Sequence, residues 1–94
     1  MHYFYILYST ESDKFYIGET HDLKSRIEKH NEHSYQKSFT KIAEDWQIVL
    51  CLECTDKQQA LYLEKFVKRM KSRKFIQKTI DTPEILQDII INKK

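Results

Sequence analysis

Apolar and polar positions near the start of the chain follow the pattern of a β-hairpin. Aromatic and aliphatic residues fill two short runs on either side of a polar turn; the three segments are residues 3–8, 9–14 and 15–17. Such runs predict two strands joined by the turn. Strand alternation puts Tyr3 and Tyr5 on one face and Phe4 and Ile6 on the other, so we expect one apolar face and one that presents hydroxyl groups.

Helical spacing of apolar residues and capping side chains predict the later elements. In chain order they are a helix after Asp22, a buried strand over 46–54, a helix after Asp56, a helix through Ile80 capped by Ser72 and a short helix starting at Pro83. Residues 33–45 are expected to form a loop or a short irregular helix. A chain of 94 residues has room for one core, so residues 1–94 are expected to form a single domain.

The hairpin carries more phenol groups than packing requires. They belong to Tyr3, Tyr5, Tyr8 and Tyr16. A buried tyrosine needs a partner for its hydroxyl, whereas phenylalanine or leucine would fill a core without one. The single glycine of the chain, Gly18, closes the hairpin. Glycine serves where φ is positive or where another group comes close, so Gly18 either ends the strand or leaves room for a ligand beside Tyr16.

Charge is distributed unevenly although the net charge is only +2. The stretch 65–80 has no acidic residue and contains Lys65, Lys68, Arg69, Lys71, Arg73, Lys74 and Lys78. It is either a solvated helix face or a surface that contacts phosphates. No apolar run approaches the roughly 18 residues of a membrane-spanning helix, and the N-terminus lacks the features of a secretory signal. We therefore expect a cytoplasmic protein with no membrane partner.

Two cysteines, Cys51 and Cys54, have a spacing that occurs in redox and zinc sites. Structural zinc needs four ligands, and the sequence offers no second pair. Redox motifs usually open a helix, whereas this pair falls at the end of a predicted strand. The sequence therefore favours two reduced thiols in a strand.

Three further side chains combine charge with a marked position. Arg26 and His30 are four residues apart in the first helix, so both border its apolar stripe. Glu64 lies in or beside the stripe of the next helix, where a carboxylate is costly to bury unless it is paired or binds a cation. Each has a structural interpretation as well. Arg26 and His30 would face solvent, and Glu64 would pair with Lys68 or Lys71.

The order of these features resembles the GIY-YIG nuclease family over nearly the whole chain, and most of all its small single-domain bacterial members. Residues 16–18, Tyr-Ile-Gly, match the second signature, whereas residues 3–5, Tyr-Phe-Tyr, replace the first and keep only its tyrosine. The resemblance implies an α/β fold of the α+β type, with a three-stranded antiparallel sheet flanked by helices. It also implies a metal-dependent endonuclease that hydrolyses DNA, with DNA repair as its setting.

The resemblance further implies roles for individual residues. Tyr5 and Tyr16 would line the site, Arg26 would contact the scissile phosphate, and His30 would assist proton transfer. Glu64 would bind one divalent metal ion, Mg²⁺ or else Mn²⁺. A tyrosine, Tyr5 or Tyr16, would activate water with His30 behind it. Gly18 supports the site, and the expected nucleic-acid contacts are Lys68, Lys71, Arg73 and Lys74.

Two other functions fit the same residues. A nucleic-acid-binding module could keep the fold and the basic surface without catalysis, and the altered first signature favours it. A structural domain could use the tyrosines as core, and it would show no salt-dependent affinity for DNA. The sequence does not distinguish DNA from RNA. It contains no base-reading element, so strong sequence specificity would require a separate targeting protein.

Overall fold

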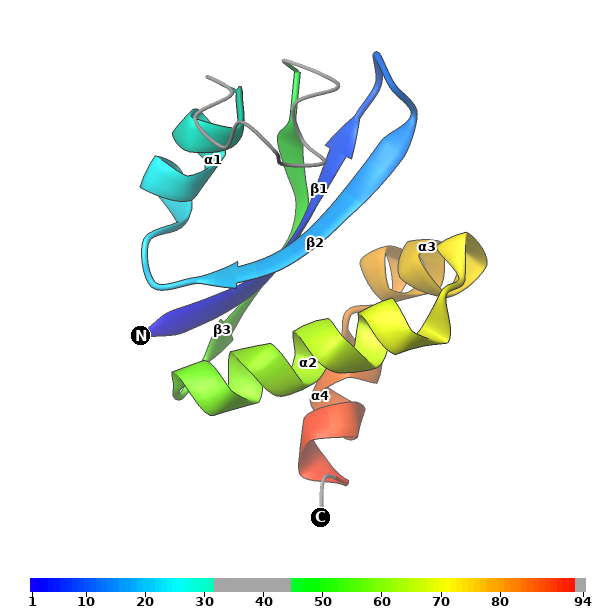
Figure 1. The fold of residues 1–94 in the computed structure, drawn as a ribbon. Helices are drawn as coiled ribbons and strands as arrows, with labels where there is room; N and C mark the ends of the chain where they lie inside the picture. Colours follow the sequence, from blue (N-terminus) through cyan, green and yellow to red (C-terminus); the bar gives the residue numbers. More distant parts are fainter. Residues whose placement is uncertain (32–44, 93–94) are drawn as a thin grey trace.

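The computed structural model describes residues 1–31 and 45–92, apart from the side chains of residues 29–31. These residues form three strands and four helices (Figure 1). In chain order the elements are β1 (His2–Ser9), β2 (Lys14–Thr20), α1 (Leu23–Asn31), β3 (Gln47–Cys54), α2 (Lys57–Met70), α3 (Arg73–Asp81) and α4 (Glu84–Ile91). The expected α+β fold and hairpin are confirmed. Most of the expected 33–45 loop falls outside the described residues.

The strand β1 is the centre of the antiparallel sheet, whose order is β2-β1-β3. Its four middle residues, Phe4 to Leu7, are fully buried. Since successive side chains of a strand point to opposite faces, burial on both sides means that each face of the sheet is covered. The central strand therefore divides the interior into two hydrophobic clusters.

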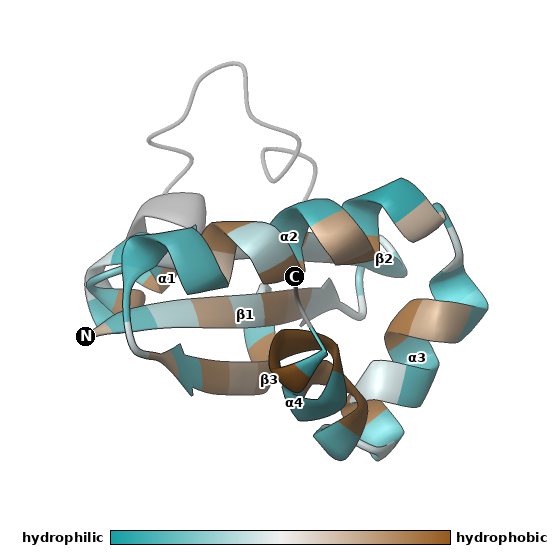
Figure 2. Ribbon diagram, turned by 90° about the horizontal axis from the view of Figure 1, so that it is seen from below, coloured by the Kyte–Doolittle hydropathy of each residue, from teal (hydrophilic) through white to brown (hydrophobic). Residues whose placement is uncertain are grey.

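The larger cluster lies on the face covered by α2 and α4. Its buried members are Phe4, Ile6, Ile17, Leu50, Cys54, Ala60, Leu63, Val67 and Leu86. Figure 2 shows that most of α4 is hydrophobic, and Ile89 and Ile90 of this helix pack against the cluster. The last helix thus covers a flank of the core, whereas Met70, at the end of α2, is 47% exposed.

The smaller cluster lies on the opposite face, beneath α1. Tyr5, Leu7 and Trp46 are buried there, and Leu23 and Ile27 of α1 pack against them. The expectation that this face presents hydroxyl groups is therefore wrong for Tyr5, whose exposure is 0%. Leu23 and Ile27 are four residues apart and therefore lie on the same side of α1, which lets the helix cover this face of the sheet.

The strand β3 is an edge strand and is less buried than its apolar sequence predicts. Ile48 and Val49 are 41% and 37% exposed. The ladder pairs Ile6 with Leu50 but Leu7 with Ile48, so it skips Val49. An extra residue of this kind is a β-bulge, which interrupts the alternation of faces. Ile48 and Val49 are exposed because β3 has a neighbouring strand on one side only and because the bulge interrupts its pairing.

The helices α1, α2 and α3 begin at the capping residues that the sequence indicated, whereas α4 has no side-chain cap and begins at Glu84, directly after Pro83. Asp22 Oδ1 accepts from the Ser25 N–H at 3.1 Å, and Ser72 Oγ accepts from Phe75 N–H at 3.0 Å. At α2 the capping is reciprocal: Asp56 accepts from the backbone of Gln59, whose side chain accepts from the backbone of Thr55. These bonds satisfy backbone donors that the first helical turn leaves unpaired.

The turn of the hairpin is held by a residue far along the chain. Asp45, just before β3, accepts from Ser9 Oγ at 2.5 Å and from the Glu11 N–H at 2.9 Å. Ser9 Oγ in turn accepts from the Ser12 N–H. These donors favour the ionised carboxylate and lower the pKa of Asp45, with the Ser9 hydroxyl as the largest cause.

The Asp45 contacts predict a pH-dependent stability. A carboxyl whose pKa is lower in the folded state contributes stability above its unfolded pKa of about 3.9, and that contribution is lost as the pH falls through the folded pKa. We expect Asp45→Ala to lower the urea midpoint near neutral pH, and the gap from wild type to narrow on acidification. The control is Asp88→Ala, because the Asp88 carboxylate has no hydrogen bond within the described residues; a gap for Asp45→Ala that stays constant with pH would contradict the prediction.

Candidate functional site

Two of the predicted catalytic phenols lie next to each other on neighbouring strands. The ring centroids of Tyr5 and Tyr16 are 6.3 Å apart, with 33° between the ring planes. Tyr5 is fully buried, whereas Tyr16 is partly exposed and packs against the smaller cluster. The hairpin therefore brings both tyrosines together, with Tyr16 as the one closer to solvent.

Gly18 makes this arrangement possible. It pairs with Tyr5 in the ladder, and a Cβ at this position would lie 2.6 Å from Tyr5 Oη and 2.7 Å from Tyr5 Cζ. The same Cβ would be 3.1 Å from Tyr16 Cε1. Gly18 lies within β2 and has no positive φ, so the interpretation that it ends the strand is wrong. The room it leaves is filled by the Tyr5 ring.

The helix α1 brings a cation to the same face of the sheet. Arg26 is partly buried, on the helix whose Leu23 and Ile27 pack beside the tyrosines. His30 falls in the last turn of this helix, and its side chain is outside the described part of the chain. Backbone geometry thus brings the Arg26 helix to Tyr5 and Tyr16.

Glu64 comes from α2, on the other face of the sheet. Its side chain is 20% exposed, and Oε1 accepts from Lys68 Nζ at 3.2 Å one turn later. The ion pair that the sequence offered as a structural interpretation therefore exists. Because β2 is an edge strand, α1 and α2 flank the same free edge from opposite faces (Figure 1).

The donor set limits the kind of metal site. Among residues 1–31 and 45–92, no group of three His, Cys, Asp or Glu side chains could hold a metal ion. Glu64 is one partly exposed carboxylate. Mg²⁺ keeps several water ligands and is usually held by one or two carboxylates together with substrate phosphates, so a lone carboxylate suits this ion. The residues fit a metal that is bound together with substrate.

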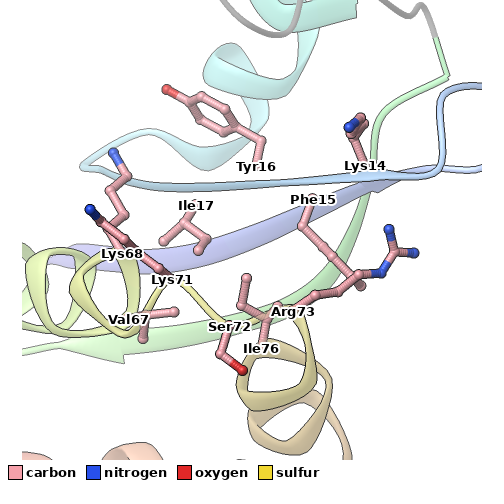
Figure 3. A pocket seen from close by; sticks show the side chains of 10 residues that line it. All are labelled: Lys14, Phe15, Tyr16, Ile17, Val67, Lys68, Lys71, Ser72, Arg73 and Ile76. Carbon is pink, nitrogen blue, oxygen red and sulfur yellow. The ribbon is translucent and has the colours of Figure 1, made fainter.

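A pocket of about 490 Å³ runs along β2, between this strand and the α2–α3 junction; we call it the β2–α2–α3 pocket (Figure 3). Its lining residues are Lys14, Phe15, Tyr16, Ile17, Val67, Lys68, Lys71, Ser72, Arg73 and Ile76. Tyr16 and Lys68 both belong to its wall, and Lys68 is the partner of Glu64. The pocket thus links the signature strand to the helix of the predicted metal ligand.

The predicted nucleic-acid contacts do not share one environment. Lys68 and Lys71 line the pocket, whereas Lys74 is exposed on α3 outside it. Arg73 lines the pocket but is tied to the hairpin turn: it donates to the backbone oxygen of Asp13 at 2.8 Å and to Oδ1 of the same residue. Its guanidinium also lies 5.1 Å from the centroid of the Phe15 ring.

Asp13 is the centre of this anchor. Its carboxylate accepts from the Tyr8 hydroxyl as well as from Arg73. Both hydrogen bonds lower the pKa of Asp13, and the bond from the Tyr8 hydroxyl has the larger effect. The same carboxylate raises the pKa of Tyr8. The Tyr8 phenol, which the sequence left among the surplus hydroxyls, therefore has a structural partner.

Sequence reasoning did not assign Lys14 and Phe15 to the site, although both line the pocket. Both belong to β2 and adjoin Tyr16. Strand alternation was enough to put Phe15 on the face opposite Tyr16. What the sequence lacked was the position of α3, whose first residues close the pocket against that face. Neither residue carries a motif, so only the packing of distant elements reveals them.

Comparisons with known proteins agree with this geometry. The profile of the GIY-YIG catalytic domain matches residues 1–78. The UPF0213 protein YazA of Bacillus subtilis is 26% identical over 73 residues, which are 78% of this chain and 72% of that protein. No solved structure matches the chain significantly. Of the helices that the structure describes, none has the length and apolar character needed to cross a membrane.

The contact between Gly18 and Tyr5 predicts the effect of one added methyl group. Gly18→Ala would force the buried Tyr5 ring to move, and overpacking of this kind typically costs about 1–3 kcal/mol. We expect that loss in urea unfolding. In a Tyr5→Leu background, which removes the ring atoms that clash, the same Gly18→Ala change should cost clearly less. Equal costs in the two backgrounds would contradict the assignment.

Proposed function

Because the chain belongs to the GIY-YIG nuclease family, we propose that it is a divalent-metal-dependent endonuclease that hydrolyses phosphodiester bonds in DNA. Family membership implies a nucleic acid as substrate. The choice of DNA, the metal dependence and the residues below are part of the proposal.

One observation carries the proposal. The β2–α2–α3 pocket is lined both by Tyr16 of the signature strand and by Lys68 of α2, and Lys68 is hydrogen-bonded to Glu64. The predicted base and the predicted metal ligand thus come from elements that meet along the free edge of β2. Basic residues continue from this meeting point along α2, so a phosphate backbone would be attracted to the same edge.

The chemistry requires a base, a cation and stabilisation of the leaving oxygen. Water attacks phosphorus as it gives up a proton, and the ester P–O bond breaks as the leaving oxygen gains one. We assign proton removal to Tyr16 because it is the more exposed phenol. A phenol has a pKa of about 10, so activity near pH 7 requires roughly 3 units of depression. His30, whose ordinary pKa is near neutral, would pass the proton on.

Arg26 and Glu64 complete the site. The planar guanidinium of Arg26 presents donors suited to the charge that develops on the phosphate oxygens. Glu64 would hold the metal ion, which when bound supplies positive charge to the phosphate and the leaving oxygen. Lys68 already orients the Glu64 carboxyl group by its hydrogen bond. In this proposal Tyr5, fully buried over Gly18, positions Tyr16 rather than meeting the substrate.

Lys68, Lys71 and Lys74 would contact phosphates, and Arg73 would contribute less because Asp13 already pairs with it. The described residues contain no helix or ribbon with an evident set of base-reading side chains. The proposed enzyme therefore recognises DNA structure, such as flaps or branches, and a partner protein would supply any sequence targeting.

The Glu64–Lys68 pair favours a second candidate. A carboxylate already satisfied by a lysine can serve the fold without a metal ion. In that case the protein would be a nucleic-acid-binding module that has lost catalysis, with the same basic surface. Cleavage measured alongside binding separates the two functions.

We expect the wild type to cut flap or branched DNA in the presence of Mg²⁺ or Mn²⁺. Glu64→Gln and Arg26→Ala should each lower kcat by about a hundredfold or more, because each removes charge stabilisation from the transition state. Gel assays on a labelled panel of single-stranded, duplex, flap and branched DNA test this. The matched control is Glu84→Gln, the same change at an exposed position of α4, which should leave kcat unchanged.

Stability must be matched for this comparison to be informative. Exposed ion pairs four residues apart on a helix contribute only about 0.5 kcal/mol or less, so Glu64→Gln should unfold near the wild-type midpoint. Lys68→Gln should raise KM more than it lowers kcat, since it removes a phosphate contact and keeps the metal ligand. Salt-dependent binding without cleavage in wild type would instead favour the binding module.

A further inference from the structure

The β2–α2–α3 pocket combines an apolar floor with basic ends. Phe15, Ile17, Val67 and Ile76 supply the floor. Lys68 and Lys71 lie at one end and Arg73 lies at the other, where Lys14 borders the pocket from the opposite side of β2 (Figure 3). None of its lining residues is acidic. A ligand that fits this surface has a flat or apolar centre with negative charge on both sides.

We propose that this pocket binds one unpaired nucleotide of the DNA strand that is cut, with its base on the apolar floor and its flanking phosphates on Lys71 and Lys14. The inference rests on the proposed function, and it adds that the DNA strand has an unpaired nucleotide next to the candidate site. A volume of about 490 Å³ is within the ordinary range for small-ligand pockets, about 300–1,000 Å³. Apolar surfaces hold bases of any sequence because every base has a flat π face.

Two of the four cations at the pocket are already paired with a carboxylate. Lys68 is paired with Glu64, and Arg73 is paired with Asp13. Lys14 and Lys71 form no ion pair within the described residues. They come from opposite ends of the pocket (Figure 3), as the two phosphates on either side of a nucleotide require. Charge complementarity thus selects a nucleotide within a strand over a neutral ligand.

The backbone of Lys71 is a second, independent observation. Lys71 is the C-cap of α2, with φ 48° and ψ 40°, in the left-handed region. Glycine or asparagine usually occupies this position, because a side chain is disfavoured there. A lysine is therefore a poor choice for ending the helix. It does, however, place an ammonium group at the pocket.

Continuity with the candidate site separates this occupant from an acidic peptide. Tyr16, the proposed base, borders the pocket from the other side of the edge strand β2 (Figure 3), so a DNA strand that passes over this edge would have the phosphate under attack next to the nucleotide in the pocket. A paired base is stacked within a duplex and cannot enter, so the nucleotide must be unpaired. The protein should then prefer single-stranded or flap DNA over a continuous duplex.

An abasic scan tests the proposal. The probe is a labelled single-stranded oligonucleotide in which one base at a time is removed, and binding is measured by fluorescence anisotropy in a chelator so that nothing is cut. With wild type, loss of the base at one position should weaken binding about tenfold, the order expected for one base contact. With Ile76→Ala, that position should lose most of its effect. An equal response at all positions would overturn the proposal.

A second measurement keeps the test valid if Ile76→Ala fails to fold. An oligonucleotide with 5-iodouracil at the sensitive position is photocrosslinked to wild type and digested with trypsin. The crosslink should fall on the peptide of residues 15–24, which carries Phe15 and Tyr16. A crosslink only elsewhere, or competition by an acidic peptide but not by DNA, would overturn the proposal.

Failure of this inference is distinguishable from failure of the proposed function. If wild type cuts DNA but shows neither the position-specific loss nor the crosslink, the pocket proposal is wrong and the nuclease remains. If both signals appear without cleavage, the pocket holds a nucleotide and the nuclease proposal is wrong. Absence of any oligonucleotide binding overturns both.

The Lys71 cap makes a separate prediction. Lys71→Gly should raise the urea midpoint, because glycine relieves the left-handed backbone. The same change should weaken oligonucleotide binding several-fold, because a phosphate contact is lost. The control is Lys65→Gln, which removes a charge from an exposed position of α2 outside the pocket. This change should affect binding much less. Unchanged binding by Lys71→Gly would contradict the role of Lys71.

Discussion

The close approach of Tyr5 to Gly18 is the constraint on which the candidate site depends. Any side chain at position 18 would occupy space that the Tyr5 ring already fills. The ring can therefore lie across its partner strand, next to Tyr16 and beneath α1. Without that space Tyr5 would have to leave the smaller cluster, and the surface on which α1 carries Arg26 would change with it. The absence of a side chain at Gly18 thus determines where Tyr5 lies and which surface it presents to Tyr16 and α1.

Local signals in the sequence predicted most of the fold. The hairpin, the capping residues Asp22, Asp56 and Ser72 and the stripe of α2 depend on neighbours a few residues away, so pattern alone identifies them. The exposure of β3 was not predictable in this way. Its apolar run indicated burial, but an edge position and a skipped Val49 depend on how the strand pairs. Pairing is a property of the whole sheet.

The candidate site likewise combines features that depend on neighbouring residues with features that depend on long-range contacts. Tyr5, Tyr16 and Gly18 were found from the sequence because they share one hairpin. The basic stretch of α2 and α3 was also visible, but its members differ in ways that composition hides. Arg73 is bound by Asp13, sixty positions earlier in the chain, and Lys71 adopts a left-handed backbone. Which cations are available for a ligand depends on such long-range contacts.

Those contacts also bear on how the chain folds. The hairpin is the most local element of the sequence, yet its turn is fastened by Asp45 and Arg73, which are far along the chain. An isolated two-stranded hairpin is marginal in water, so the first twenty residues gain their final form only when β3 and α3 arrive. Contacts between residues this far apart in the chain raise the contact order, which is associated with slower folding. The signature strands therefore depend for their final form on elements at the far end of the domain.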